Sequence, residues 1–300
     1  MRIAITGSSG LIGPALVVGL REHGHEVIRL VRRAPAGPGE IHWDPRAAAG
    51  GLPPAALAGV EAAVNLAGAG IADRRWTAAY QAEIRASRLQ ATGALVAALT
   101  ALDPPPRVLL QGSAIGWYGD TGGAEVDETS PGGTGFLPDL VRDWEAAADP
   151  ARAAGIRVVT LRTGIVLSPH GGALGRMLLP FRLGLGARLG PGTQVMSWIT
   201  LPDLTGIAAF LLGHPELTGP VNVTTPFPAT NAELTAALGA VLHRPAVLTL
   251  PVPALRLLLG GVSSDLLSSA RVLPRKLLAA GYQYQYPQLR PALAAVLSGG

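Results

Sequence analysis

The sequence predicts an α/β fold in which helices cover both faces of a doubly wound parallel sheet. Short apolar segments alternate with helix-length segments through the first half of the chain. A glycine-rich turn, from Gly7 to Gly13, lies between the first apolar segment and the first helical one. Strands separated by helices pair in parallel through right-handed crossovers. The second half is less regular and predicts a smaller lobe on the substrate side.

Each strand is indicated by an apolar run that ends at a polar or glycine residue. The predicted strands of the sheet are 2–5, 26–31, 40–43, 60–65, 107–111 and 156–162, with 221–223 as a late addition. The predicted helices follow the glycine turn and cover 77–102, 136–154 and 202–212, where apolar residues recur at helical spacing.

The pattern changes near residue 246, where short helical stretches with proline breaks begin. We therefore predict a nucleotide-binding domain over 1–245 and a C-terminal domain over 246–300. Segment 168–200 is expected to contribute to the substrate-side lobe, although it lies within the first range.

The composition excludes several classes of protein. The 300 residues are 48% hydrophobic and 15% charged, and the absence of cysteine rules out disulfides and thiolate chemistry. No uninterrupted apolar stretch reaches the roughly 18 residues of a membrane span, so we expect a cytoplasmic protein with no membrane partner. The net charge is +4, but no basic run exceeds two residues, which argues against nucleic acid. The six histidines lack metal-ligand spacing, so no metal is predicted.

The glycine turn predicts a cradle for a dinucleotide pyrophosphate. Gly7 permits a sharp turn, Gly10 lets the backbone approach a phosphate, and Gly13 lets helix and strand pack closely. The helix N-terminus then offers unpaired N–H groups and the positive end of its dipole. The same cradle includes Ser9, Leu11 and Ile12. The alternative is a tight strand-to-helix turn that binds no ligand.

The residues at the end of the second predicted strand indicate which dinucleotide the site binds. An NAD site usually places an acid here to bind the ribose 2′-hydroxyl, but Arg32 and Arg33 stand at this point instead. Guanidinium groups bind phosphate and a carboxylate would repel it. We therefore predict NADP as the cofactor, with a pair of solvated arginines as the alternative.

Further cofactor contacts are expected where other strands end, because ligands bind at the carboxyl ends of such sheets. These positions are Leu66, Ala67, Gly68, Ser113 and Thr163.

Several motifs carry a family resemblance. The glycine turn, the Asn-Leu-Ala-Gly of 65–68 and Ser113 resemble the extended short-chain dehydrogenase/reductases, which include nucleotide-sugar epimerases. Segments 71–77, 84–88, 116–120, 197–199 and 219–222 resemble an atypical subgroup, the epimerase family proteins. Segments 272–277 and 280–282 resemble the C-terminal domain of unknown function of that subgroup. Thr200 and Ala270 depart from its pattern, since histidine and glutamine are common there.

The resemblance implies an NADP-binding Rossmann fold, but it supplies no reaction. We add Ser87, which lies in segment 84–88, to the predicted cofactor contacts. The family mechanism uses Tyr-x-x-x-Lys, and this chain lacks it: the residue four before its one lysine, Lys276, is Val272. Matching Glu145 to the acid that usually follows the pair puts Leu137 and Val141 in place of the tyrosine and lysine.

Ser113 and Tyr118 are the best remaining candidates for proton chemistry. Ser113 follows the predicted strand 107–111, and Tyr118 lies in a glycine-flanked loop shortly after it. The alternatives are a hydroxyl that satisfies the local backbone and an aromatic residue that packs.

Three further residues are substrate candidates. Arg75 and Trp76 could bind an anion and stack on a ring, or they could form a surface cluster. Trp198 is the third, with packing in the lobe as its alternative. The leading hypothesis is an NADP(H)-binding oxidoreductase or epimerase-like enzyme acting on a small polar or nucleotide-linked substrate. The competing hypothesis is a non-catalytic NADP(H)-sensing protein, and the oligomeric state is left open.

Overall fold

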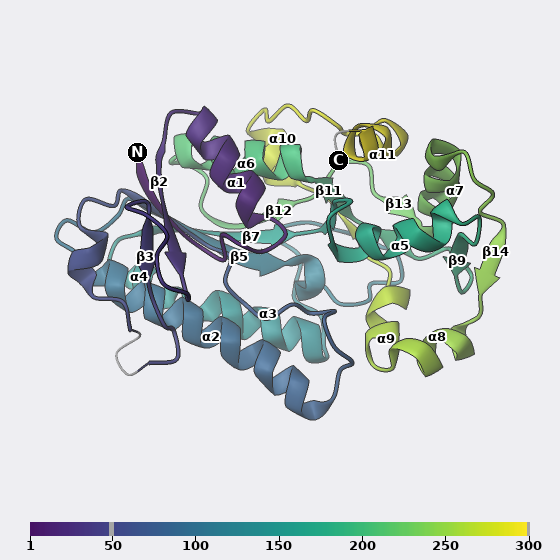
Figure 1. Cartoon of the computed structure of the whole chain (residues 1–300), viewed down its shortest axis with the longest axis horizontal. Helices are drawn as coiled ribbons and strands as arrows, with labels where there is room; N and C mark the ends of the chain where they lie inside the picture. Colours follow the sequence, from purple (N-terminus) through teal and green to yellow (C-terminus); the bar gives the residue numbers. More distant parts are fainter. Residues whose placement is uncertain (48–50, 299–300) are drawn as a thin grey trace.

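A computed structural model describes residues 1–47 and 51–298 of the chain. Its central sheet has seven parallel strands in the order β12-β7-β5-β4-β1-β2-β3 (Figure 1). The chain adds β2 and β3 on one side of β1 and the other strands on the opposite side, so the strand order reverses between β1 and β4. These strands are β1 (Arg2–Thr6), β2 (Glu26–Val31), β3 (Glu40–His42), β4 (Ala62–Asn65), β5 (Val108–Ala114), β7 (Arg157–Thr163) and β12 (Gly219–Val223).

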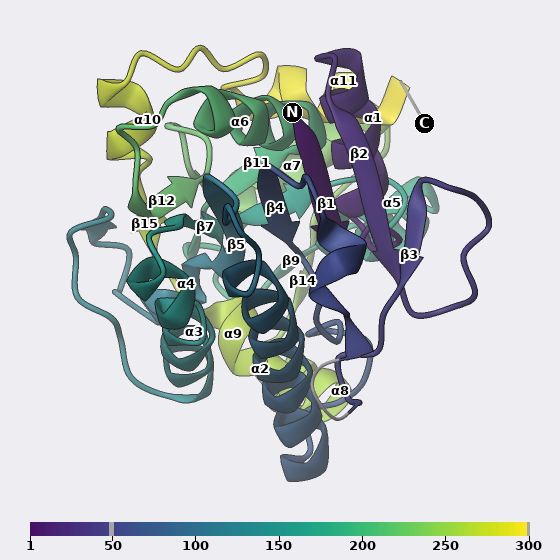
Figure 2. The same cartoon turned by 90° about the vertical axis from the view of Figure 1, so that its left-hand side faces the viewer.

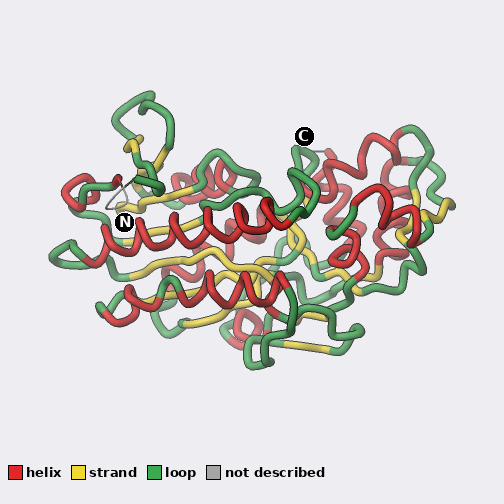
Figure 3. Tube along the Cα trace, turned by 90° about the horizontal axis from the view of Figure 1, so that it is seen from below, coloured by secondary structure: helices red, strands yellow, loops and turns green. Residues whose placement is uncertain are grey.

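Helices cover both faces of this sheet, which confirms the predicted α/β architecture (Figures 2 and 3). One face packs against α1 (Gly13–Glu22), α6 (Leu201–Gly213) and α10 (Arg275–Ala279). The other face packs against α2 (Ala78–Thr100), α3 (Phe136–Ala146) and α4 (Asp149–Ala153). The strands are apolar on both faces because both faces are buried.

A second lobe lies beyond the carboxyl ends of β5 and β7, on the right in Figure 1. Its core joins side chains from α5 (Gly172–Arg182), α7 (Asn231–Leu242) and α11 (Leu289–Ser298). Distant segments meet here, since β14 (Leu248–Leu250) pairs with β9 (Ala187–Leu189). The lobe therefore includes α7 as well as the two segments that the sequence indicated. Its remaining elements are β8 (Ile165–Leu167), β10 (Val195–Met196), β11 (Trp198–Thr200), β13 (Ala229–Thr230), α8 (Val252–Leu259) and α9 (Val262–Leu267).

Two elements differ from the sequence-based expectation in ways that affect the site. The predicted helix 136–154 is divided into α3 and α4, because Pro150, the second residue of α4, has no N–H to continue the hydrogen bonds of α3. Strand β5 runs to Ala114, so Ser113 lies within the sheet rather than after it. The short 3₁₀ turn η3 (Ile115–Trp117) follows directly. β6 (Glu125–Val126) then pairs with β15 (Arg271–Val272), and η2 (Pro54–Leu57) precedes β4. Among the described helices, none is both long and apolar enough to cross a bilayer.

Candidate functional site

The glycine turn between β1 and α1 has the geometry that its glycines require. Gly7 adopts a φ of +66°, and a Cβ on it would lie 2.6 Å from the backbone of Leu66. A Cβ on Gly13 would lie only 2.4 Å from the carbonyl oxygen of Gly7. Gly10 is different, because it is exposed and a Cβ there would meet only that same oxygen, at 3.4 Å. Two glycines thus close the turn. The third, Gly10, donates its N–H to Gly7 O at 3.0 Å and is exposed without a side chain in the way of a ligand.

The N-terminus of α1 is available to an anion. Ile12 is its N-cap residue and no side chain caps it within the described residues. Ser9 is exposed, whereas Leu11 and Ile12 are partly buried beside it. Unpaired N–H groups and the helix dipole both favour a negative group at this point. These features favour an anion at the turn, and the predicted pyrophosphate contacts of the glycine turn stay a prediction.

The loop after β4 is fixed against this turn by a buried polar network. The hydroxyl of Thr6 accepts hydrogen bonds from the backbone N–H groups of Leu66, at 3.0 Å, and Ala67, at 3.2 Å. It donates to Asn65 Oδ1 at 2.6 Å, and Asn65 in turn donates to Gln111 at 2.9 Å. Leu66, Ala67 and Gly68 consequently lie beside the glycine turn, at the point where the strand order reverses. Dinucleotides bind across this point in sheets of this kind.

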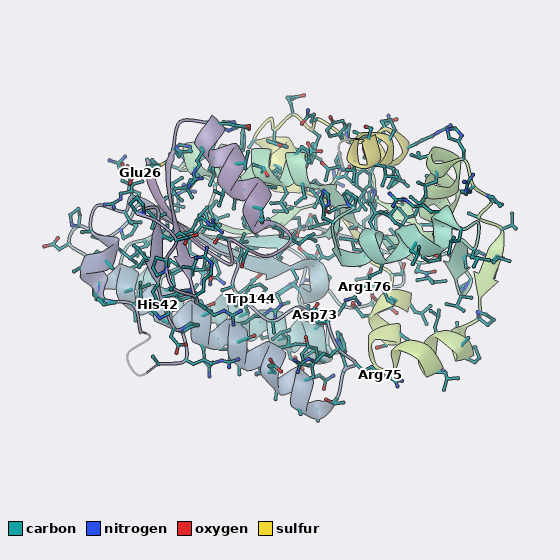
Figure 4. The ribbon with its side chains drawn as sticks, in the orientation of Figure 1. Glu26, His42, Asp73, Arg75, Trp144 and Arg176 are labelled. Atoms are coloured by element: carbon teal, nitrogen blue, oxygen red, sulfur yellow. The ribbon has the colours of Figure 1, made fainter. Side chains whose placement is uncertain are left out.

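Arg88 on α2 supports the same loop, and the sequence analysis assigned it no role. Its Nη1 donates to Ala69 O at 3.0 Å, and its guanidinium lies over the ring of Trp144, 4.9 Å from the centroid. Trp144 is labelled in Figure 4. The side chain is buried without a carboxylate partner in the described part of the chain, and burial lowers the pKa of Arg88 to about 10. Ser87 assists, because its hydroxyl accepts from Ala69 N at 3.0 Å. The predicted cofactor contact of Ser87 stays a prediction.

The two arginines at the end of β2 have different environments. Arg33 makes a bidentate ion pair with Glu40, with Nη1–Oε2 and Nη2–Oε1 distances of 2.7 and 2.6 Å. Arg32 is exposed and forms no ion pair within residues 1–47 and 51–298. Arg29 also reaches Glu40, at 3.1 Å, and its Nε donates to Ser8 in the glycine turn at 3.2 Å. Glu40 was missed at the sequence level, and only its position at the start of the next strand could have indicated it.

Ser113 begins a second buried network. Its Oγ donates to Glu145 Oε1 at 2.6 Å, and Glu145 is held by Arg162 through Nε–Oε1 and Nη2–Oε2 contacts of 2.9 and 3.0 Å. Arg162 Nη1 donates to the Tyr118 hydroxyl at 3.2 Å, and that hydroxyl donates to Asn222 Oδ1 at 2.7 Å. Ser113 and Tyr118, predicted as a pair, are thus joined by protein groups.

The hydroxyl protons of Ser113 and Tyr118 both point into the protein. Tyr118 is 2% exposed, and its pKa is raised, chiefly by burial. The predicted catalytic role of Tyr118 therefore gains no support from this placement, and it stays a prediction. Ser113 retains oxygen lone pairs that can accept a hydrogen bond. Thr163, at the end of the neighbouring β7, is partly buried and donates to Leu161 O at 3.1 Å.

Apolar residues face the turn that follows β5. A Cβ on Gly116 in η3 would lie 3.3 Å from Leu137 Cβ and 3.8 Å from Val141 Cγ2. These are the two residues that the sequence comparison put in place of the usual tyrosine and lysine. Neither can donate or accept a proton, so the part of α3 that faces η3 provides no acid–base pair.

The loop before α2 reaches the second lobe. Arg75 is exposed and its Nη2 donates to Leu257 O on α8 at 3.0 Å. Trp76 packs edge-on against Phe136 with ring centroids 5.1 Å apart. Asp73 and Arg176 lie between the two lobes in Figure 4, with 3.8 Å between Oδ1 and Nη2.

Two of the substrate candidates, Arg75 and Trp76, therefore lie where the lobes meet. Trp198 is 2% exposed and belongs to the core of the second lobe, so its substrate role remains a prediction without structural support.

Comparison with known proteins assigns the family. Residues 3–224 match the model of the NAD dependent epimerase/dehydratase family, and residues 250–296 match a domain of unknown function, DUF1731. The chain belongs to the NAD-dependent epimerase/dehydratase family. An epimerase family protein of Mycobacterium bovis is 48% identical over 97% of this chain and 96% of its own length. The human epimerase family protein SDR39U1 is 42% identical over 99% of this chain and 100% of its own.

Solved structures agree with this assignment. The crystal structure of human SDR39U1 with NADPH has a TM-score of 0.90, with 41% identity and 99% of each chain covered. A nucleoside-diphosphate sugar epimerase from Corynebacterium glutamicum has a TM-score of 0.81 and 33% identity, over 99% of this chain and 58% of that one. The predicted resemblance and the Rossmann-type fold are therefore confirmed.

Proposed function

We propose that this protein is an NADP(H)-dependent oxidoreductase or epimerase-like enzyme acting on a small polar or nucleotide-linked substrate. The observation that carries the proposal is the exposed turn at Gly10 with the α1 N-terminus, together with Arg32 exposed at the end of β2. The human relative with NADPH supports the same cofactor here.

Each end of the cofactor has its own residues in this proposal. The glycine turn and α1 bind the pyrophosphate, Arg32 binds the 2′-phosphate, and Leu66 to Gly68 line the path between the two halves of the sheet. When bound, the nicotinamide supplies a hydride. Ser113 acts as an acceptor, because its own proton is used in the hydrogen bond that it donates to Glu145. It can therefore orient a hydroxyl of the substrate, but it cannot protonate a carbonyl.

The test has two stages. Calorimetric titration with NADPH and NADH should show tight binding of NADPH and weaker binding of NADH. Spectroscopic assays with a panel of hydroxyl and carbonyl substrates should then show turnover that Ser113→Ala reduces. Ser298→Ala, which alters an exposed serine on α11, is the control. If neither NADPH nor NADH binds, the proposal is refuted.

A non-catalytic NADP(H)-sensing role is the second candidate. The apolar Leu137 and Val141 beside Gly116 favour it, since the usual acid–base pair is missing. Tight cofactor binding without turnover of any substrate, together with capture of a partner that depends on NADP⁺ or NADPH, is the result expected for this role.

A further inference from the structure

Glu40 is an unusual residue to find next to a phosphate site. Its side chain is 8% exposed and accepts four hydrogen bonds or ion-pair contacts. Two come from Arg33, one from Arg29 at 3.1 Å, and one from the backbone N–H of Ala36 at 2.7 Å. Arg33 holds the pKa of Glu40 down at about 2, so the carboxylate is charged throughout the neutral range.

The position of this cluster matches the adenosine end of the proposed cofactor site. β2 and β3 are parallel neighbours, with Arg29 opposite Glu40 and Val31 opposite His42. Arg33 lies just after the carboxyl end of β2, and its side chain reaches back to Glu40. The ribose 2′ position of a dinucleotide is recognised at this strand end. His42, whose Nδ1 lies 3.2 Å from Arg33 O, and Glu26, at the start of β2, are both labelled in Figure 4.

A carboxylate and a phosphate satisfy a guanidinium in the same way. Both accept two parallel N–H donors from the planar fork of arginine. Arg33 directs both of its terminal nitrogens at Glu40, and Nη1 also donates to Ala34 O at 2.8 Å. A 2′-phosphate that approached Arg33 would therefore meet occupied donors and a nearby negative charge.

We propose that Glu40 lowers the affinity for NADP(H) by competing with the 2′-phosphate for Arg33. The proposal rests on the NADP(H) binding put forward under Proposed function. It makes Glu40 a residue that determines cofactor specificity, because its effect is confined to ligands that carry the 2′-phosphate. The alternative is that Glu40 supports Arg33 in a position that favours binding of the 2′-phosphate. In that case, replacing Glu40 would weaken NADPH binding.

The Glu40→Gln variant separates these roles. Glutamine can still accept from Ala36 N, so the loop before β3 keeps that hydrogen bond, while the charge that holds Arg33 is lost. We expect NADPH to bind about tenfold more tightly, the size of one charge-assisted hydrogen bond. NADH should be nearly unaffected. Glu40→Ala should shift NADPH in the same direction, and thermal melting checks that both variants are folded.

Calorimetry should use NADPH, NADH, and 2′,5′-ADP as a probe that carries the phosphate but no nicotinamide. Glu26→Gln is the matched control, since Glu26 pairs with Arg2 at 3.2 Å at the other end of the same strand. The gain in NADPH affinity expected of Glu40→Gln should vanish when Arg33→Ala is combined with it. If NADPH binds the wild type but Glu40→Gln leaves it unchanged or weakens it, the competition is refuted and the proposed cofactor stands. If neither NADPH nor 2′,5′-ADP binds the wild type, both proposals fail.

Discussion

Replacing Arg162 with methionine should destabilise the fold much more than the loss of an ordinary surface charge. The Arg162 side chain is 3% exposed, and its guanidinium makes both contacts to Glu145 and one to Tyr118. It also lies 4.0 Å from the centroid of the Trp117 ring. Methionine fills part of the volume but leaves Glu145, which is 12% exposed, as a carboxylate with Ser113 as its remaining side-chain donor.

The size of the effect follows from this burial. Removing one partner of a buried ion pair costs about 3–5 kcal/mol, because the other charge is left without compensation. The partial exposure of Glu145 argues for the lower end of that range. In a chain of this size, a loss of about 3 kcal/mol lowers the melting temperature by on the order of 5–10 °C.

Denaturant unfolding of Arg162→Met and Arg142→Met gives a matched comparison. Arg142 pairs with Asp139 at 2.7 Å, but both side chains are about half exposed, at 49% and 51%. Its loss should cost under about 1 kcal/mol. Equal, small losses of unfolding free energy in the two variants would contradict the conclusion that the buried network of Ser113, Glu145 and Arg162 stabilises the fold.

Three other changes test separate parts of the structure. Gly13→Ala should abolish cofactor binding, because its Cβ would lie 2.4 Å from a backbone oxygen. The control is Gly93→Ala, which has open space on α2 and should stabilise the fold by about 0.5–1 kcal/mol. Calorimetry measures cofactor binding and thermal melting measures stability in both variants. Burial raises the pKa of Asp265 to about 6, so this carboxylate destabilises the folded state increasingly from about pH 4 and fully above pH 6. Asp265→Asn should therefore add about 2 kcal/mol to the free energy of unfolding at pH 7, with the gain fading as the pH falls from 6 to 4; a pH-independent gain would contradict this. Arg32→Ala should weaken NADPH binding roughly tenfold, and more than Arg33→Ala does. NADH is the control ligand.

The sheet could be predicted from the sequence because its strands are short, apolar and separated by helices. Segment 221–223 was correctly added to the sheet as a late strand, and it forms the edge strand β12. The break between α3 and α4 was missed, although Pro150 signals it. Helical periodicity continues across this break, so the apolar pattern alone does not reveal it.

The direction of the side chains at the candidate site could not be predicted from the sequence. Ser113 was predicted to follow a strand and to line the crevice. The structure places it within β5, one residue before the end of that strand, and its role in the crevice stays a prediction. Its hydroxyl proton is controlled by Glu145, which is brought alongside only when α3 packs on the sheet. Similarly, Arg32 and Arg33 are equivalent in sequence, and only the pairing of β2 with β3 places Glu40 beside one of them.

The two buried networks constrain the chemistry of the crevice, one at the strand reversal between β1 and β4 and the other at the ends of β5 and β7. On the β1–β4 side, Thr6 and Asn65 use their donors and acceptors to hold the loop at Leu66, so they contribute shape rather than reactivity. At the ends of β5 and β7, Ser113 donates a hydrogen bond to Glu145, while Leu137 of α3 faces Gly116. A reaction at this end must therefore obtain its proton from the substrate, from solvent or from the second lobe. Turnover that survives Ser113→Ala with an unchanged pH profile would be consistent with this, whereas a pH profile altered by that substitution would place the proton transfer at the Ser113–Glu145 pair after all.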